Sequence, residues 1–140
     1  MILMMLNFSV TLYMIGVIWM VQLVHYPLMA SVGPDVFVRY QARHVRMMTF
    51  VVGPAMLVEV ITMVLILASS VGIQFWLSVV GFALIGVIWL STAFLQVPCH
   101  AKLEKGFDPE THRFLVQSNW IRTIAWTLRG SLMNWMIFST

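Results

Sequence analysis

Apolar residues follow one another along most of this chain, and charged residues interrupt them at only a few places. No Lys, Arg, Asp or Glu occurs from Met1 to Pro34, and from Met47 to Ala101 the only such residue is Glu59. A helix needs about 20 apolar residues to cross a hydrocarbon core of ~30 Å, so the first run holds one span and the second holds two. A fourth, largely apolar stretch covers 114–138. The pattern predicts membrane-spanning helices at about 6–28, 44–68, 73–98 and 114–138.

Composition supports this interpretation, because 61% of the residues are hydrophobic and 9% are charged. Ordinary soluble domains carry about 25% charged residues. We therefore expect an all-α integral membrane protein, in which 1–140 form a single domain of four transmembrane helices in an up-and-down bundle. The lipid bilayer is the expected partner. The chain has no basic and aromatic pattern typical of nucleic-acid binding.

The basic residues indicate how the helices are oriented in the membrane. None of them lies in the N-terminal segment or in the turn at 69–74. By the positive-inside rule, the loops that join helices 1 to 2 and 3 to 4 face the cytoplasm. We expect a multi-pass protein of the bacterial inner (cytoplasmic) membrane with both termini in the periplasm. The basic residues are Arg39, Arg43, Arg46, Lys102, Lys105, Arg113, Arg122 and Arg129.

The tetrapeptide GVIW occurs twice, at 16–19 and at 86–89. It falls in the middle of the first and third predicted helices, which cross the membrane in the same direction. This placement favours an internal repeat, in which two tandem helical hairpins are related by an axis along the membrane normal. A chance match is the alternative, because short apolar words recur readily in a chain of this composition.

Polar side chains gather at the predicted cytoplasmic end of all four helices. Helices 1 and 3 each bring a glutamine and a histidine there, and helices 2 and 4 begin with polar residues at the same end. Lipid does not solvate such groups, so we expect them to face the bundle interior and to line a pocket. The predicted ligand-binding residues are Gln22, His25, His44, Gln96, His100, Asn119 and Arg122.

Two functions are compatible with this pocket. It could bind a hydrophobic small molecule or a redox cofactor, namely a quinone, a haem or an aromatic metabolite, as in an oxidoreductase. Alternatively, the same residues only hold the helices together, and the protein is an accessory or assembly subunit of a larger membrane complex or a homo-oligomer. His25 and His100 lie on diagonal helices and could hold haem iron or another metal from opposite sides. No HxxxH, ExxH or CxxC motif occurs, so the spacing selects no metal.

Glu59 is the most isolated charge in the sequence. Glu59 and Arg129 each lie nine residues from the predicted outer ends of helices 2 and 4, about 14 Å at 1.5 Å per residue. An unpaired charge at this depth costs about 3 kcal/mol or more, so the matching depths predict an intramembrane ion pair. The alternative is a protonated Glu59, because burial favours the neutral form of a carboxyl group.

Three segments carry a resemblance to known membrane proteins. VQLVHYP, FVRYQARHVRMMTFVVGPAMLVE and IWLSTAFLQVPCHAKLEKGFDPETHRFLVQSNWIRTIAWTLRG together resemble a family of small uncharacterised four-helix bacterial inner-membrane proteins. This resemblance implies the fold and carries no reaction. More remotely, NWIRT and the size of the chain are similar to anthrone-oxygenase-like membrane proteins, which implies oxygenation of a polycyclic phenolic substrate. Trp120, Arg122 and Thr123 match that pattern, whereas VHYP and QVPCH lie outside it.

Overall fold

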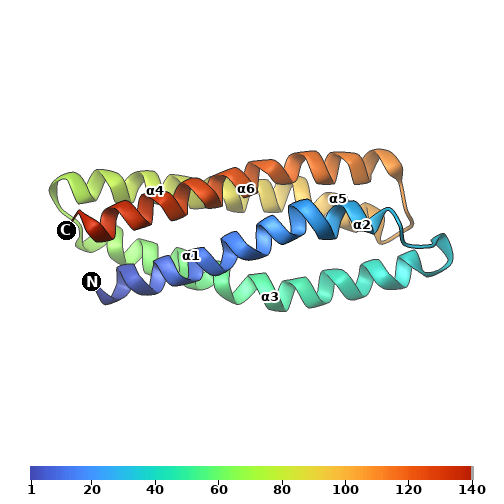
Figure 1. Cartoon of the computed structure of the whole chain (residues 1–140), viewed down its shortest axis with the longest axis horizontal. Helices are drawn as coiled ribbons and strands as arrows, with labels where there is room; N and C mark the ends of the chain where they lie inside the picture. The colour runs from blue at the N-terminus through green and yellow to red at the C-terminus, as the bar shows by residue number, and fades with distance from the viewer. Residues whose placement is uncertain (140) are drawn as a thin grey trace.

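The computed structural model describes residues 1–139, which form four helical rods joined by short connections (Figure 1). The first and third rods each contain a π-helical turn, labelled η, within an otherwise continuous helix. In chain order the elements are α1 (Ile2–Met20), η1 (Val21–His25), α2 (Tyr26–Met29), α3 (Pro34–Ser69), α4 (Gly72–Ser91), η2 (Thr92–Gln96), α5 (Val97–Leu103) and α6 (Pro109–Phe138). The predicted all-α, four-helix fold is confirmed.

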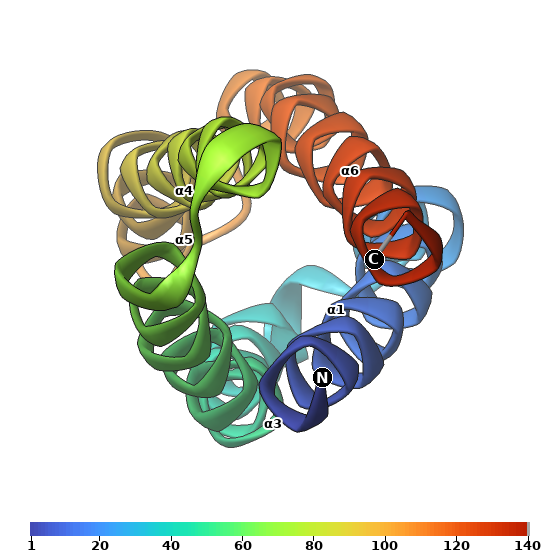
Figure 2. The ribbon, with the colours of Figure 1, turned by 90° about the vertical axis from the view of Figure 1, so that its left-hand side faces the viewer.

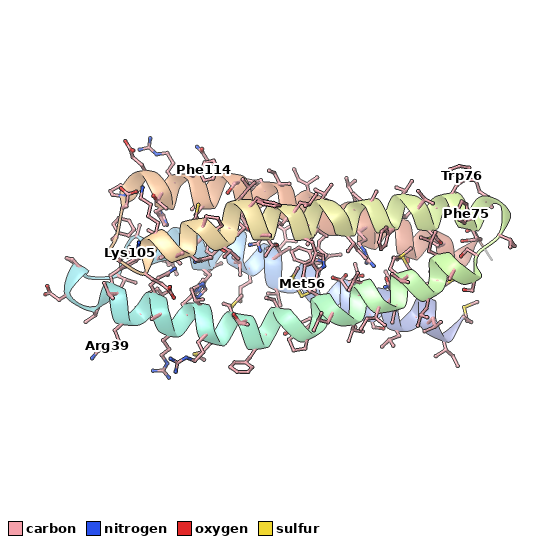
Figure 3. All side chains as sticks on the ribbon, turned by 180° about the vertical axis from the view of Figure 1, so that it is seen from behind. Arg39, Met56, Phe75, Trp76, Lys105 and Phe114 are labelled. Atoms are coloured by element: carbon pink, nitrogen blue, oxygen red, sulfur yellow. The ribbon has the colours of Figure 1, made fainter. Side chains whose placement is uncertain are left out.

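The four rods alternate in direction and form a ring when viewed along the bundle (Figure 2). α1 packs against α3 and α6, and α4 packs against the same two helices. α1 and α4 are therefore diagonal, as in an up-and-down bundle. Both termini lie at one end of the bundle, beside the turn between α3 and α4 (Figure 1). The opposite end carries Arg39 and Lys105 (Figure 3) and is called the basic end below.

Local sequence sets the two ends of α3. Pro34 stands at the start of this helix, where its missing N–H would have no partner within the helix. Ser70 and Val71 alone join α3 to α4, and Gly72 then takes a φ of 59°, a left-handed conformation that favours glycine. α3 also continues through Pro54 as a single helix. The predicted span at 44–68 is thus the lipid-facing part of a longer helix, whose first turns are polar.

Asp108 begins α6. Its carboxylate accepts a hydrogen bond from the backbone N–H of Thr111 at 3.1 Å, and its Oδ2 atom lies 2.8 Å from Lys102 Nζ. Hydrogen bonds to the carboxylate lower the pKa of Asp108 to about 2; the one from Lys102 has the largest effect, and those from Thr111 come next. The cap begins α6 directly after the short loop between the third and fourth rods, and the surface ion pair spans this loop at the basic end.

The π-helical turns stand at equivalent places in the first and third rods. η1 ends two residues before Pro27, and η2 ends two residues before Pro98. Proline lacks an N–H, and its ring clashes with the carbonyl group four residues earlier. A wider turn accommodates this clash without breaking the helix, and such turns are frequent at functional sites. Both turns lie at the level where the sequence predicts the pocket.

Three rods, Ile2–Met29, Pro34–Ser69 and Gly72–Leu103, are long and apolar enough to cross a membrane. Apolar side chains such as Trp76 and Phe114 point outward from the bundle, while Met56 points between the helices (Figure 3). Among the described residues α6 does not reach the same hydropathy. Its sequence carries polar residues that lie buried on its inner face, including Asn119, Arg122 and Arg129.

Candidate functional site

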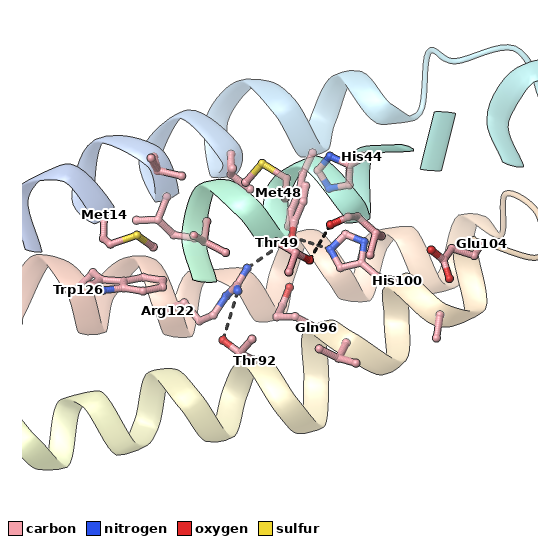
Figure 4. A pocket seen from close by; sticks show the side chains of 18 residues that line it. Met14, His44, Met48, Thr49, Thr92, Gln96, His100, Glu104, Arg122 and Trp126 are labelled. Atoms are coloured by element: carbon pink, nitrogen blue, oxygen red, sulfur yellow. Dashed lines mark hydrogen bonds between the residues drawn. The ribbon is translucent and has the colours of Figure 1, made fainter. Parts of the chain in front are cut away.

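A cavity of about 220 Å³ lies between α3 and the α4–α5 rod, toward the basic end (Figure 4). Apolar side chains from α1 and α3, among them Met14, Ile18 and Met48, form much of its wall, and Trp126 of α6 closes it toward the bundle centre. The polar groups that line it are Tyr26, His44, Thr49, Thr92, Gln96, His100, Glu104 and Arg122. The cavity therefore combines an apolar body with a polar end.

Arg122 reaches the wall of this cavity from α6 and is 8% exposed. Its Nε and Nη2 atoms donate to Asn119 Oδ1 at 2.9 and 2.5 Å. Nη1 donates to the Thr92 hydroxyl at 3.3 Å, and Nη2 donates to the Tyr26 hydroxyl at 3.4 Å (Figure 4). Each of these partners is a neutral group.

No carboxylate lies within 4.0 Å of the Arg122 guanidinium in residues 1–139, where the ion pairs are Lys102–Asp108 and Glu59–Arg129, although Glu104 lines the same cavity. A buried charge without a counter-ion is costly in a low-dielectric interior, even when it is hydrogen-bonded. The cavity beside the guanidinium is therefore a favourable place for an electron-rich oxygen from outside this chain.

Gln22 and Asn119, both predicted as ligand-binding residues, lie one layer behind Arg122 and do not line the cavity. Asn119 Nδ2 donates to Gln22 Oε1 at 2.9 Å, and Gln22 Nε2 donates to the carbonyl group of Val116 at 3.1 Å. These bonds leave Asn119 Oδ1 directed at the guanidinium. Gln22 and Asn119 thus position Arg122.

Gln96 does line the cavity, as the sequence predicts. Its Nε2 atom donates to the Ser118 hydroxyl at 2.9 Å. Its Oε1 atom is buried and has no hydrogen-bond partner among the described residues. Burying an acceptor without a donor costs about 1–3 kcal/mol, so this oxygen is a natural acceptor for a ligand hydroxyl or N–H group.

The three histidines of the predicted site stand in a row. His25 Nε2 lies 2.8 Å from His44 Nδ1, and the ring centroids of His44 and His100 are 5.3 Å apart. His100 is held by hydrogen bonds with the Tyr26 hydroxyl at 2.9 Å and with Gln41 Nε2 at 2.7 Å. His44 and His100 line the cavity, whereas His25 lies behind His44.

This row does not fit a haem held between His25 and His100. His44 is in contact with both imidazoles and stands between them. The cavity of about 220 Å³ is also below the range of about 300–1,000 Å³ that encloses whole drug-sized ligands. Within the described part of the chain, no group of three or more His, Cys, Asp or Glu residues is placed to hold a metal ion.

Glu59 and Arg129 form a second polar site, farther from the basic end. Arg129 Nη1 lies 3.1 Å from Glu59 Oε1, and both side chains are buried. Arg129 also donates to Asn7 Oδ1 at 2.7 Å and to the Thr11 hydroxyl. Trp126 Nε1 donates to Glu59 Oε2 at 3.0 Å. Both carboxylate oxygens thus accept hydrogen bonds from donors on α1 and α6, and this geometry supports the predicted pair of Glu59 with Arg129.

Several polar residues of these sites were not predicted as site residues. Asn7 and Thr11 stand four residues apart in a segment without charged residues, so their shared helical face was a usable signal. Thr92 and Ser118 gave no such signal, because the hydroxyl groups of serine and threonine commonly hydrogen-bond to the backbone of their own helix. The residues concerned include Asn7, Thr11, Tyr26, Tyr40, Gln41, Thr49, Thr62, Thr92, Glu104, Ser118 and Trp126.

Comparison with protein-family models, with curated proteins and with solved structures finds no match for this chain.

Proposed function

We propose that this protein binds a lipid-soluble aromatic molecule with quinone or phenol oxygens in the cavity beside Arg122. The observation that carries the proposal is the buried guanidinium of Arg122, which borders an apolar cavity and has no carboxylate partner within the described chain. A quinone carbonyl or a phenolate would accept a charge-assisted hydrogen bond from it. The apolar side chains that line the cavity would pack against the aromatic ring of the ligand.

Gln96 provides a second polar contact, and together with Arg122 it suits both redox states of such a molecule. A quinone oxygen only accepts hydrogen bonds and would use Arg122 or the hydroxyl of Tyr26. A quinol hydroxyl also donates, and the unpartnered Oε1 atom of Gln96 would accept its hydrogen bond. The remote resemblance of NWIRT to anthrone-oxygenase-like proteins adds support for a phenolic aromatic ligand.

We place this site in the bacterial inner membrane, with all four rods spanning it and the basic end in the cytoplasm. α6 carries too many polar residues to qualify by hydropathy, but they are buried against the other rods. A helix whose polar stripe faces the bundle presents apolar residues to lipid, as Ile121 and Leu128 do here. The family resemblance and the two hairpins with GVIW support the same arrangement.

Binding is tested on the purified protein in lipid nanodiscs with 2,3-dimethoxy-5-methyl-1,4-benzoquinone, a quinone headgroup without a tail, by equilibrium dialysis. We expect the wild type to bind it and Arg122→Gln to weaken binding by about tenfold or more, because a hydrogen bond to a charged group contributes about 1.5–3 kcal/mol. Arg113→Gln, an exposed arginine of the same helix, is the control and should bind like the wild type.

The outcomes separate the two roles that the sequence left open. Saturable binding that depends on Arg122 supports the proposal, and quinone reduction by a cell extract that requires the added wild-type protein and is lost with Arg122→Gln would identify an oxidoreductase. Absence of binding, together with copurification of a larger membrane complex, would contradict the proposal and favour an accessory subunit.

A further inference from the structure

The cavity has one exposed rim. Of the residues that line it, those exposed at the surface are Thr49 of α3 and Val97 and Ala101 of α5. All three border the seam between α3 and α5, and both helices belong to rods that are apolar enough to cross a membrane. Two large apolar side chains flank the rim on the outer surface, Phe50 at 75% and Phe94 at 72% exposed. The rim therefore faces the region that lipid chains occupy.

Hydrogen bonds close the other seams of the bundle at the depth of the cavity. Between α1 and α6, Trp19 Nε1 donates to the Thr127 hydroxyl at 3.1 Å, and the Trp19 ring packs edge-on against Trp120. Between η1 and α3, His25 meets His44.

The fourth rod is tied to the third in the same way. Gln96 donates to Ser118, and Arg122 donates to Thr92. Across the α3–α5 seam, the side-chain hydrogen bond within the described residues is Gln41 to His100. Gln41 precedes Thr49 by about two helical turns, roughly 12 Å toward the basic end. The seam is thus held near the aqueous surface and open at the rim.

We infer that the ligand is a membrane-resident quinone with an isoprenoid tail, which enters laterally between α3 and α5 and keeps its tail in the lipid. This inference rests on the proposed function, because it takes the ring to occupy the cavity beside Arg122. The cavity of about 220 Å³ is below the usual range of about 300–1,000 Å³ for enclosed ligands, so it holds a headgroup and leaves a tail outside. The tail leaves past Val97 and packs against Phe50 and Phe94.

The test compares two probes in nanodiscs, the tail-less 2,3-dimethoxy-5-methyl-1,4-benzoquinone and decylubiquinone, which has the same headgroup and a ten-carbon tail. Val97→Trp fills the rim, and Leu90→Trp is the matched control, since Leu90 is comparably exposed on the same rod and does not line the cavity. Val97→Trp should weaken decylubiquinone binding by about tenfold or more, because the indole occupies the rim through which the tail leaves, and the seated headgroup would then force its tail into a clash. The same variant should change headgroup binding by less than about threefold, because the polar contacts are kept. Leu90→Trp should change neither.

Binding of the headgroup by Val97→Trp also shows that the variant is folded, and Ala101→Trp on the same rim replaces it if that binding is lost. Equal weakening of both probes by each rim variant, or unchanged decylubiquinone binding, would overturn the lateral portal while the headgroup site stands. If the wild type binds neither probe, the proposed function fails, and the portal with it.

Discussion

Arg122 and Arg129 stand two helical turns apart on the buried face of α6, and within the described chain only Arg129 meets a carboxylate, 3.1 Å away on Glu59. The two arginines therefore have different roles. Arg129 is paired with Glu59 in a buried cluster that ties α1, α3 and α6 together. Arg122 is held by neutral groups at the edge of a cavity, where its charge is available to a ligand.

Replacing each arginine by glutamine should separate these roles in the ligand-free protein. Arg129→Gln strands the Glu59 carboxylate and should lower the free energy of unfolding by about 3 kcal/mol. Arg122→Gln removes an uncompensated buried charge and should change it by less than about 1 kcal/mol in either direction. Unfolding in mixed micelles of a mild detergent and dodecyl sulfate measures both. Equal losses would mean that Arg122 is a structural residue like Arg129.

The pairing of Glu59 with Arg129 should also appear as energetic coupling. Glu59→Gln should destabilise the fold by about 3 kcal/mol, because it leaves the guanidinium without its counter-ion. The double variant Glu59→Gln with Arg129→Gln should lose only about 3 kcal/mol, as much as either single variant and about half of the sum of the two, which is a coupling energy of about 3 kcal/mol. Additive losses in the same unfolding assay would show that the two side chains act independently.

The two histidines that the sequence placed in one pocket should differ in ligand binding. His100→Ala should weaken binding of the quinone headgroup by about tenfold, because it removes a cavity wall and the hydrogen bond that orients Tyr26. His25→Ala should change binding by less than about threefold, because His25 lies behind His44 and acts at most through one hydrogen bond. Equilibrium dialysis of both variants measures the difference, and a larger loss for His25→Ala would contradict the geometry.

Gly130 marks a close approach of α6 to α1. A Cβ atom at this position would overlap Ile15 Cδ1. The overlapping atom is the end of a half-buried side chain that can change its rotamer, and alanine favours a helix over glycine by about 1 kcal/mol. Gly130→Ala should therefore change the free energy of unfolding by less than about 1 kcal/mol, whereas Gly130→Ala with Ile15→Val, which removes the overlapping methyl group, should be more stable than Ile15→Val alone. A loss above about 2 kcal/mol for Gly130→Ala would show that Ile15 cannot move.

Membrane orientation is tested by cysteine labelling in a Cys99→Ser background. The proposal puts the α3–α4 turn in the periplasm and the basic end in the cytoplasm, so an impermeant maleimide added to intact cells lacking an outer-membrane barrier should modify Ile73→Cys and not Lys105→Cys. Permeabilised cells, in which both should react, are the control. Labelling of Lys105→Cys alone in intact cells would reverse the orientation.

The pattern of apolar and charged residues was enough to predict four helices and their alternating directions. Hydropathy depends on which residues follow one another, so it needs no tertiary information. It underestimated helix length, because polar turns such as the one that begins at Pro34 continue a helix beyond the lipid. The matching depths of Glu59 and Arg129 followed from counting residues along antiparallel helices.

Only the tertiary structure decided which polar residues share a surface. Gln22 and Gln96 both lie in the π-helical turn of their rod, yet Gln22 bonds Asn119 behind the guanidinium, while Gln96 lines the cavity and has an unpartnered oxygen. The difference depends on helix rotation and on the π-helical turns, which shift every following side chain around the axis. Sequence spacing gives the face of one helix, but a cavity needs several helices at fixed distances, and packing alone sets those distances.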